Sequence, residues 1–203
     1  MSAKRVILAG ILGAIAMFLW SAVAHIVTPL GETGISEIPN EPSVLTAMQS
    51  SLGANHGMFL FPGMGLGPNA TREQKSQAMQ QYQAKLDSNP SGILIYHPAG
   101  AKGMTGSKLA IEFLTEVLEA LIVAFLIAGS RATTLGGRAA IGLMVGIAAA
   151  VTTNISYWNW YGFPTNYTVA YMSIEIVAFL LAGVVAGVVL GRGVTNRSVA
   201  ATA

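Results

Sequence analysis

The chain lacks cysteine and contains few charged residues. None of its 203 residues is Cys, which excludes disulfide frameworks, thiolate metal sites, covalently attached haem and cysteine nucleophiles. Only 10% of the residues are charged, and eleven Lys and Arg against nine Asp and Glu leave a formal net charge of +2. Because no basic stripe accompanies this balance, nucleic acid is not an expected partner.

Recognisable catalytic motifs are also missing. The sequence contains no nucleophile elbow, no H-E-x-x-H motif and no Walker loop, so it supplies no candidate catalytic residue. Gly63, Gly65 and Gly67 depart from the G-x-G-x-x-G spacing, and turns explain them better than a nucleotide loop does. An embedded b-type haem is not expected from this chain alone, because His25 is the only histidine in an apolar segment.

Long apolar segments dominate what the chain does contain, since 53% of its residues are hydrophobic. The first runs from Val6 to Val27 without an acid, Lys or Arg, and its 22 residues can cross the roughly 30 Å hydrocarbon core of a bilayer. Three further spans are expected at 109–128, 139–155 and 169–190. The predicted fold is an all-α membrane protein with a four-transmembrane-helix bundle. A cleaved signal peptide is the competing interpretation of the first span, because Ala22 and Ala24 form an A-x-A site.

The basic residues near the spans predict an orientation. They all fall on one side of the predicted bundle: Lys4 and Arg5, Arg131 and Arg138, and Arg192 and Arg197. The positive-inside rule places that side in the cytoplasm, with both termini. The expected organisation is a cytoplasmic N-terminus and first span over 1–29, an extracytoplasmic segment over 30–107, and spans two to four with a cytoplasmic C-terminus over 108–203.

The segment 30–107 is rich in Pro, Gly, Ser and Asn, yet two short elements are predicted within it. Thr71 can cap a helix near 72–86 that ends before Pro90. Ile93 to Tyr96 has the composition of a short strand. A long connection of this kind is usually functional or bound by a partner. We therefore expect a cap over the bundle and contacts with other proteins.

Small and aromatic residues predict how the spans pack. Glycines recur every four residues in two spans, which keeps them on one helix face and allows close backbone approach within the bundle or between subunits. They are Gly142 and Gly146 in the third span and Gly183, Gly187 and Gly191 in the fourth. Tyr and Trp residues from Tyr157 to Tyr171 gather at the outer ends of the same spans. This pattern is typical of an interfacial belt, with an aromatic substrate cage as the alternative.

Carboxylates within the spans are the main candidate site. Glu112, Glu116 and Glu119 share a roughly 60° arc of one helix. A carboxylate facing lipid costs ~2.5–3.5 kcal/mol at the bilayer centre, so this arc should face protein or water. Glu175 of the fourth span lies at a similar expected depth, and His25 lies near the outer surface. We expect these five residues to form a cluster in the outer half of the bundle, to which Asn154 can contribute.

Three interpretations of this cluster compete. It is a hydrogen-bonded structural core in which some carboxyl groups are protonated, a site for a divalent cation with oxygen and nitrogen ligands, or part of a proton or ion route. Glu-x-x-His pairs are absent, which disfavours a di-iron site. The almost wholly apolar inner halves of the spans count against a complete channel. His56 and His97 lie in the long segment and could join His25 only if that segment folded over the bundle.

The stretch Asn159-Trp160-Tyr161-Gly162-Phe163-Pro164, followed by Tyr167, resembles a turn in small, uncharacterised bacterial multi-pass membrane proteins. This resemblance implies a bacterial inner membrane and no particular activity. The leading hypothesis is an assembly or accessory subunit of a homo- or hetero-oligomeric membrane complex, with lipid and other membrane subunits as its partners. The alternative is a cation-binding, metal-binding or proton-coupled membrane protein that uses the cluster. A membrane enzyme is the third.

Overall fold

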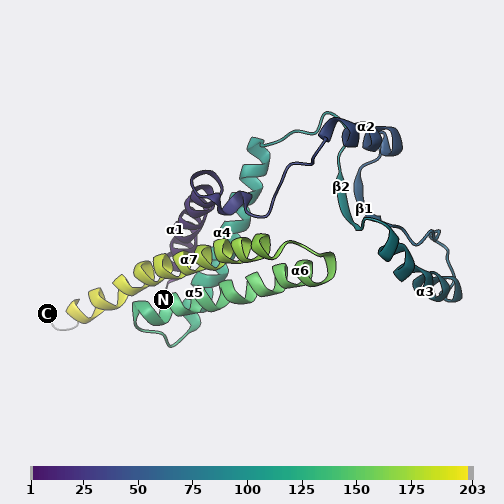
Figure 1. The fold of residues 1–203 in the computed structure, drawn as a ribbon. Coiled ribbons are helices and arrows are strands. Elements are labelled where there is room, and N and C mark those ends of the chain that lie inside the picture. The colour runs from purple at the N-terminus through teal and green to yellow at the C-terminus, as the bar shows by residue number, and fades with distance from the viewer. Residues whose placement is uncertain (1, 201–203) are drawn as a thin grey trace. The chain divides into compact units, whose positions relative to one another are not determined.

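The structure is a computed structural model that describes residues 2–200, with side chains of the last helix as far as Gly191. It is mostly helical and divides into two units, one formed by Met1–Ile35 together with Met104–Ala203, the other by Ser36–Gly103 (Figure 1). Residues 30–35, expected in the outer segment, pack with the first unit. The side chains of Arg192 and Arg197 lie outside the described residues.

The first unit contains the long helices. They are α1 (Ala3–Ala22), extended by the π-helical turn η1 (Val23–Val27) and the 3₁₀ turn η2 (Pro29–Glu32), then α4 (Gly106–Gly129), α5 (Leu135–Ala150), the π-helical turn η3 (Val151–Ile155), α6 (Ser156–Tyr161) and α7 (Thr165–Ala200). Three helical stretches are long and apolar enough to cross a membrane: Ala3–Val27, Leu135–Tyr161 and Thr165–Gly191. The second expected span, 109–128, lies in α4, which has 24 residues but carries three glutamates and is not among these three stretches.

Threonine caps explain why two helices begin before their apolar runs. The Thr105 side chain accepts a hydrogen bond from the Lys108 backbone N–H at the start of α4, and Thr134 accepts one from Gly137 at the start of α5. Each cap satisfies one of the backbone donors that a helix leaves free at its first turn. These helices therefore begin three or four residues earlier than the expected limits of 109 and 139.

Helix α7 contacts α1, α4 and α5, and the buried core that α7 shares with α1 and α4 is rich in alanine. The core contains Ala9 and Ala14 of α1, Ala120 and Ala124 of α4, and Ala178, Ala182 and Ala186 of α7. Its largest fully buried side chains are Met17, Val123, Ile127 and Leu190. In Figure 1, α5 and α7 run side by side. Close helix approach through small residues is the usual packing mode in lipid, where burial of apolar surface supplies no driving force.

The predicted glycines lie where α5 and α7 approach each other. A β-carbon on Gly142 would lie 2.5 Å from the carbonyl oxygen of Phe179 and 2.8 Å from the Cα of Gly183. One on Gly146 would lie 2.7 Å from the Cβ of Phe179. The glycines of α5 thus pack within the chain, against α7, rather than at a contact between subunits.

Gly187 and Gly191 have a different neighbour, the buried Arg138. This arginine, expected in the cytoplasmic connection, lies in the first turn of α5 and is only 4% exposed. Its Nε donates to the Ala132 carbonyl at 3.1 Å and its NH1 donates to the Gly187 carbonyl at 2.9 Å. A β-carbon on Gly191 would lie 2.8 Å from that NH1. The two glycines of α7 therefore make room for an arginine that joins α5 to α7 through backbone carbonyls.

The second unit, Ser36–Gly103, contains α2 (Glu41–Leu52), β1 (Gly57–Phe61), α3 (Arg72–Ser88) and β2 (Gly92–Tyr96). The two strands pair antiparallel with Met58 opposite Ile95 and Leu60 opposite Ile93. Thr71 and Gln74 form a reciprocal capping box at the start of α3, as the predicted helix requires. None of the described residues of this unit is buried. The unit thus has regular secondary structure without a hydrophobic core of its own.

Gly142→Ala tests the α5–α7 contact. The added methyl group would meet the backbone of α7 at Phe179 and Gly183, so we expect the free energy of unfolding to fall by about 1–3 kcal/mol, in the range of overpacked cores. The thermal unfolding midpoint of the protein in detergent measures this change. Gly136→Ala is the matched control in the same helix, because its β-carbon would have no neighbour within 4 Å. Equal midpoints for the two variants would contradict the close contact.

Candidate functional site

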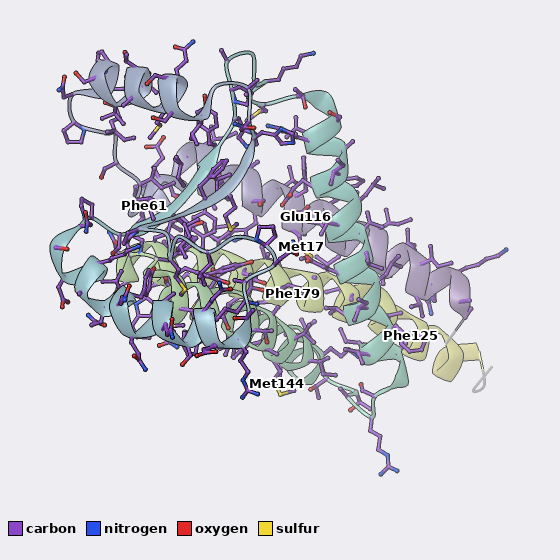
Figure 2. All side chains as sticks on the ribbon, turned by 90° about the vertical axis from the view of Figure 1, so that its right-hand side faces the viewer. Met17, Phe61, Glu116, Phe125, Met144 and Phe179 are labelled. Atoms are coloured by element: carbon purple, nitrogen blue, oxygen red, sulfur yellow. The ribbon has the colours of Figure 1, made fainter. Side chains whose placement is uncertain are left out.

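A pocket of about 280 Å³ in the first unit brings the predicted cluster together. Its polar lining comes from α1 and η1 (Ser21, His25), α4 (Glu112, Thr115, Glu116, Glu119), η3 (Thr153, Asn154) and α7 (Tyr171, Glu175). All five residues proposed from the sequence as metal ligands therefore line a single cavity. In Figure 2, Glu116 of α4 lies beside Met17 and Phe179, which line the same cavity from α1 and α7.

The carboxyl groups differ in their burial. Glu116 is only 5% exposed, and its Oε2 atom is buried without a hydrogen-bond partner among the described residues. Glu119 and Glu175 are half-buried, whereas Glu112 is exposed at the edge of the pocket. A buried polar atom without a partner costs about 1–3 kcal/mol, more if it is charged. Glu116 is therefore the member of the cluster whose placement most needs an explanation.

Asn154 connects the η3 turn to Glu175 of α7. It is only 8% exposed, and its Nδ2 donates to the Ala150 carbonyl and to Glu175 Oε2, both at 3.1 Å. Glu175 thus has a side-chain donor, in contrast to Glu116 Oε2. Next to it, the Trp20 indole N–H donates to the Ile174 carbonyl at 2.9 Å and holds α1 against α7. These two bonds set the position of Glu175 from both sides.

Two π-helical turns meet at the pocket. The η1 turn contains His25, and the η3 turn contains Thr153 and Asn154. A π turn inserts one residue into a helix and frequently occurs at functional sites. The altered backbone pattern is compensated by side chains, because Thr28 Oγ1 donates to the Ala24 carbonyl at 2.8 Å and Asn154 donates to Ala150. Such compensation matters where no water can satisfy the backbone.

His25 has a defined hydrogen-bonding role. Its Nδ1 lies 2.9 Å from the Ser21 carbonyl oxygen. Because a carbonyl only accepts, Nδ1 carries the hydrogen, and in the neutral ring Nε2 is left as an acceptor. The ring contacts Tyr171 edge-to-face, with centroids 5.9 Å apart, and Tyr171 stacks on Tyr167 at 4.3 Å. Tyr171 therefore belongs to the pocket, whereas Tyr157, Trp158, Trp160 and Tyr161 of the predicted belt are exposed.

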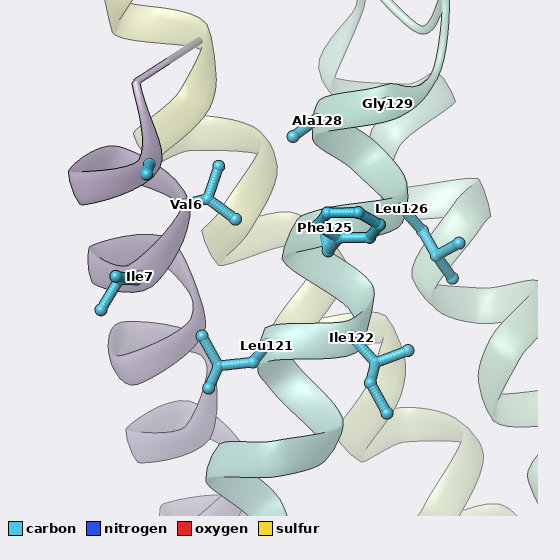
Figure 3. A pocket seen from close by; sticks show the side chains of 9 residues that line it. Val6, Ile7, Leu121, Ile122, Phe125, Leu126, Ala128 and Gly129 are labelled. Carbon is cyan, nitrogen blue, oxygen red and sulfur yellow. The ribbon is translucent and has the colours of Figure 1, made fainter.

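The remaining lining of the pocket is apolar and comes from Met17, Ile174, Ala178 and Phe179. Within the described residues, neither Lys nor Arg lines the cavity. A larger groove of about 680 Å³ between α1 and α4, which Figure 3 shows from close by, is lined by aliphatic residues and Phe125. It contains no ionisable side chain among the described residues, so the carboxylate pocket is the better candidate for chemistry.

The arrangement does not form a ready metal centre. In residues 2–200, no three Asp, Glu or His side chains lie close enough together to hold a metal ion. Glu112, Glu116, Glu119, Glu175 and His25 share a cavity but not a coordination sphere. His56 and His97 belong to the second unit.

Several site features had no clear signal in the sequence. The π turns depend on which backbone carbonyls nearby side chains can satisfy, and no residue pattern marks them. The aromatic pattern predicts Tyr171 as part of the interfacial belt, and no pattern in the sequence marks Trp20 or Thr115 as site residues. The sequence does place Thr28 and Asn154 four residues after the carbonyls that they bond, and this spacing is the only available hint.

The comparisons with known proteins add no homologue to this description. No family model, no curated protein and no solved structure matches the chain. Only the pocket and the second unit therefore bear on the function of this chain.

Glu116→Met tests whether the buried carboxyl group is structural. Met is similar in length to Glu and needs no hydrogen bond. We therefore expect the free energy of unfolding to rise by about 1–3 kcal/mol, the cost of one buried unpaired group. Thermal unfolding in detergent measures the gain, and Glu112→Met at the exposed edge is the matched control. A clear loss of stability in Glu116→Met alone would instead show that Glu116 supports a structural polar core.

Proposed function

We propose that the chain is an integral membrane protein of four spans, α1, α4, α5–α6 and α7, that binds a cation or exchanges protons at the carboxylate pocket. The observation that carries this proposal is the buried, unpartnered Oε2 of Glu116 in a cavity lined by four carboxyl groups. Because the described lining of the cavity contains neither Lys nor Arg, its carboxylates require a proton or another cation to balance them. The proposed location is the bacterial inner membrane, with both termini in the cytoplasm and Ser36–Gly103 outside.

The packing of α4 supports its inclusion among the proposed spans. Its buried residues Ala120, Val123, Ala124 and Ile127 belong to the same core as those of α1 and α7. Its lipid-facing candidates are large and apolar, including Leu118, Ile122 and Phe125, which are exposed. Because of its three glutamates, α4 is not among the three apolar stretches of membrane-spanning length. All three glutamates, however, line the pocket rather than the exposed apolar face of the helix. A helix of 24 residues spans about 36 Å, which is enough for the hydrocarbon core.

Labelling with dicyclohexylcarbodiimide tests the proposal, because this apolar reagent reacts with protonated carboxyl groups. We expect peptide mass spectrometry to find an adduct on Glu116, and a bound cation to slow its formation at least tenfold. The cations to compare are Na⁺, Ca²⁺, Zn²⁺ and n-butylammonium, each against N-methylglucamine chloride at the same ionic strength. Glu116→Gln should lack the adduct. Labelling that is as fast with each of the four cations as with N-methylglucamine would contradict cation binding, and the absence of any Glu116 adduct would contradict proton exchange.

We propose as a second candidate function that the protein assembles with copies of itself through Ser36–Gly103. The supporting observation is that none of its described residues is buried, although Met58, Leu60 and Ile95 are 68%, 56% and 62% exposed. Cross-strand pairing puts these three side chains on one face of the β1–β2 pair. The sheet has only two strands, which leaves an unpaired edge on each, and such edges can accept another strand.

A second copy of the chain is the partner that fits this face. Residues 36–103 contain equal numbers of acidic and basic residues, so two copies would not repel each other. A self-complementary face also produces the closed two-fold interface that is commonest among homo-oligomers. Other subunits of the same complex are the alternative partners for this face of the β1–β2 pair.

Met58→Lys tests this assembly. A charge at the centre of the apolar face should dissociate the oligomer, shifting the mass observed by native mass spectrometry in mild detergent to that of one chain. Met79→Lys on α3 is the matched control, because Met79 is also exposed but lies on another element. A wild-type protein that is monomeric both in detergent and after cross-linking in membranes would exclude self-assembly. An oligomer containing a second polypeptide would point to a hetero-complex instead.

A further inference from the structure

The carboxylate pocket combines acidic groups with an apolar and aromatic wall, which narrows the class of cation that it can take. We infer that its ligand is a small organic ammonium ion, such as an alkylamine, rather than a bare metal ion. This inference rests on the proposed cation-binding function and specifies its ligand.

Charge is the first argument for an ammonium ligand. Glu116, Glu119 and Glu175 are buried or half-buried, and no Lys or Arg lines the cavity within the part of the chain that the structure describes. An anionic ligand, or a neutral one without a donor, would leave Glu116 Oε2 without a partner, and a neutral donor would leave the carboxylate charge unbalanced. An ammonium group supplies up to three N–H donors, so it can satisfy Oε2 and another pocket oxygen together.

The distribution of the acidic groups is the second argument. A hard metal ion held mainly by protein side chains takes several oxygen ligands at about 2.0–2.6 Å, whereas no three acids or histidines of residues 2–200 lie close enough to share an ion. The carboxyl groups come from α4 and α7 and differ in depth, from the exposed Glu112 to the buried Glu116. A polyatomic cation can contact such separated groups, because its donors and its carbon atoms occupy different parts of the cavity.

The apolar part of the lining is the third argument, since it suits the carbon atoms of an amine. Met17, Ile174 and Phe179 supply apolar surface, and Met17 is almost fully buried. The Tyr171 ring also lines the cavity, and aromatic faces attract alkylated ammonium groups by cation–π interaction. A hydrated metal ion gains no binding free energy from contact with these apolar side chains. The amphipathic lining thus matches an amphipathic cation.

Volume limits the size of the ligand. A cavity of about 280 Å³ corresponds to roughly nine water molecules at ~30 Å³ each, and it lies just below the usual range for drug-sized ligands of ~300–1,000 Å³. Amines of about four to nine non-hydrogen atoms fit this space. The proposed binding mode places the ammonium group at Glu116 Oε2 and the alkyl chain against Met17 and Phe179.

The experiment uses the full chain in lipid nanodiscs and n-butylammonium chloride as the probe. We expect saturable binding by isothermal titration calorimetry, with one site per chain. Glu116→Gln should weaken the affinity at least tenfold, while the control Glu73→Gln, an exposed acid of α3, should leave it unchanged. n-Butanol, which has the same alkyl chain but no charge, should bind at least tenfold more weakly than n-butylammonium.

The outcomes separate this inference from the function on which it rests. Equal binding of butanol and butylammonium would overturn it, because apolar partitioning would then explain the signal. Saturable binding of Ca²⁺, Mg²⁺ or Zn²⁺ that depends on Glu116, without butylammonium binding, would overturn the ammonium assignment but leave cation binding intact. Failure of every cation to bind the wild-type protein would overturn both this inference and the proposed cation-binding function.

Discussion

The fold depends on satisfying polar groups where no water is present. In a bilayer, an unpaired backbone or side-chain group costs several kcal/mol, so each one must find a partner inside the protein. Arg138 meets this constraint by donating to the carbonyls of Ala132 and Gly187, and the two π turns meet it through Thr28 and Asn154. Against this background, the unpartnered Oε2 of Glu116 is an exception that points to a ligand.

The glycine contacts and the pocket belong to one architecture. Gly142 and Gly183 let α5 approach α7 closely, and this approach brings η3, at the end of α5, beside Glu175. Asn154 then donates to Glu175 from its π turn. On the other side, Trp20 holds α1 against α7 one residue before Glu175. Tight backbone packing therefore positions a polar pocket from four helical segments, which a loosely packed bundle with larger side chains could not do.

Sequence reasoning reached the mostly helical fold, three helices of membrane-spanning length and most of the pocket lining, for identifiable reasons. Apolar length marks a span, and steps of four and three residues group Glu112, Glu116 and Glu119 on one helix face. The sequence could not reveal that Arg138 is buried, because its side chain fits only where Gly187 and Gly191 of α7 have no side chains. Nor could it predict the coreless Ser36–Gly103 unit or the pairing of β1 with β2, since strand partners far apart in the chain depend on tertiary packing.

The central claim is that the pocket around Glu116 holds a cation, and an experimental structure tests it most directly. A high-resolution cryo-electron microscopy map of the protein in nanodiscs with n-butylammonium should contain density beside Glu116 Oε2, between α4 and α7. The same map of Glu116→Gln should lack it. The account would be contradicted by a wild-type map in which the pocket is closed and another side chain of the protein donates to Glu116 Oε2.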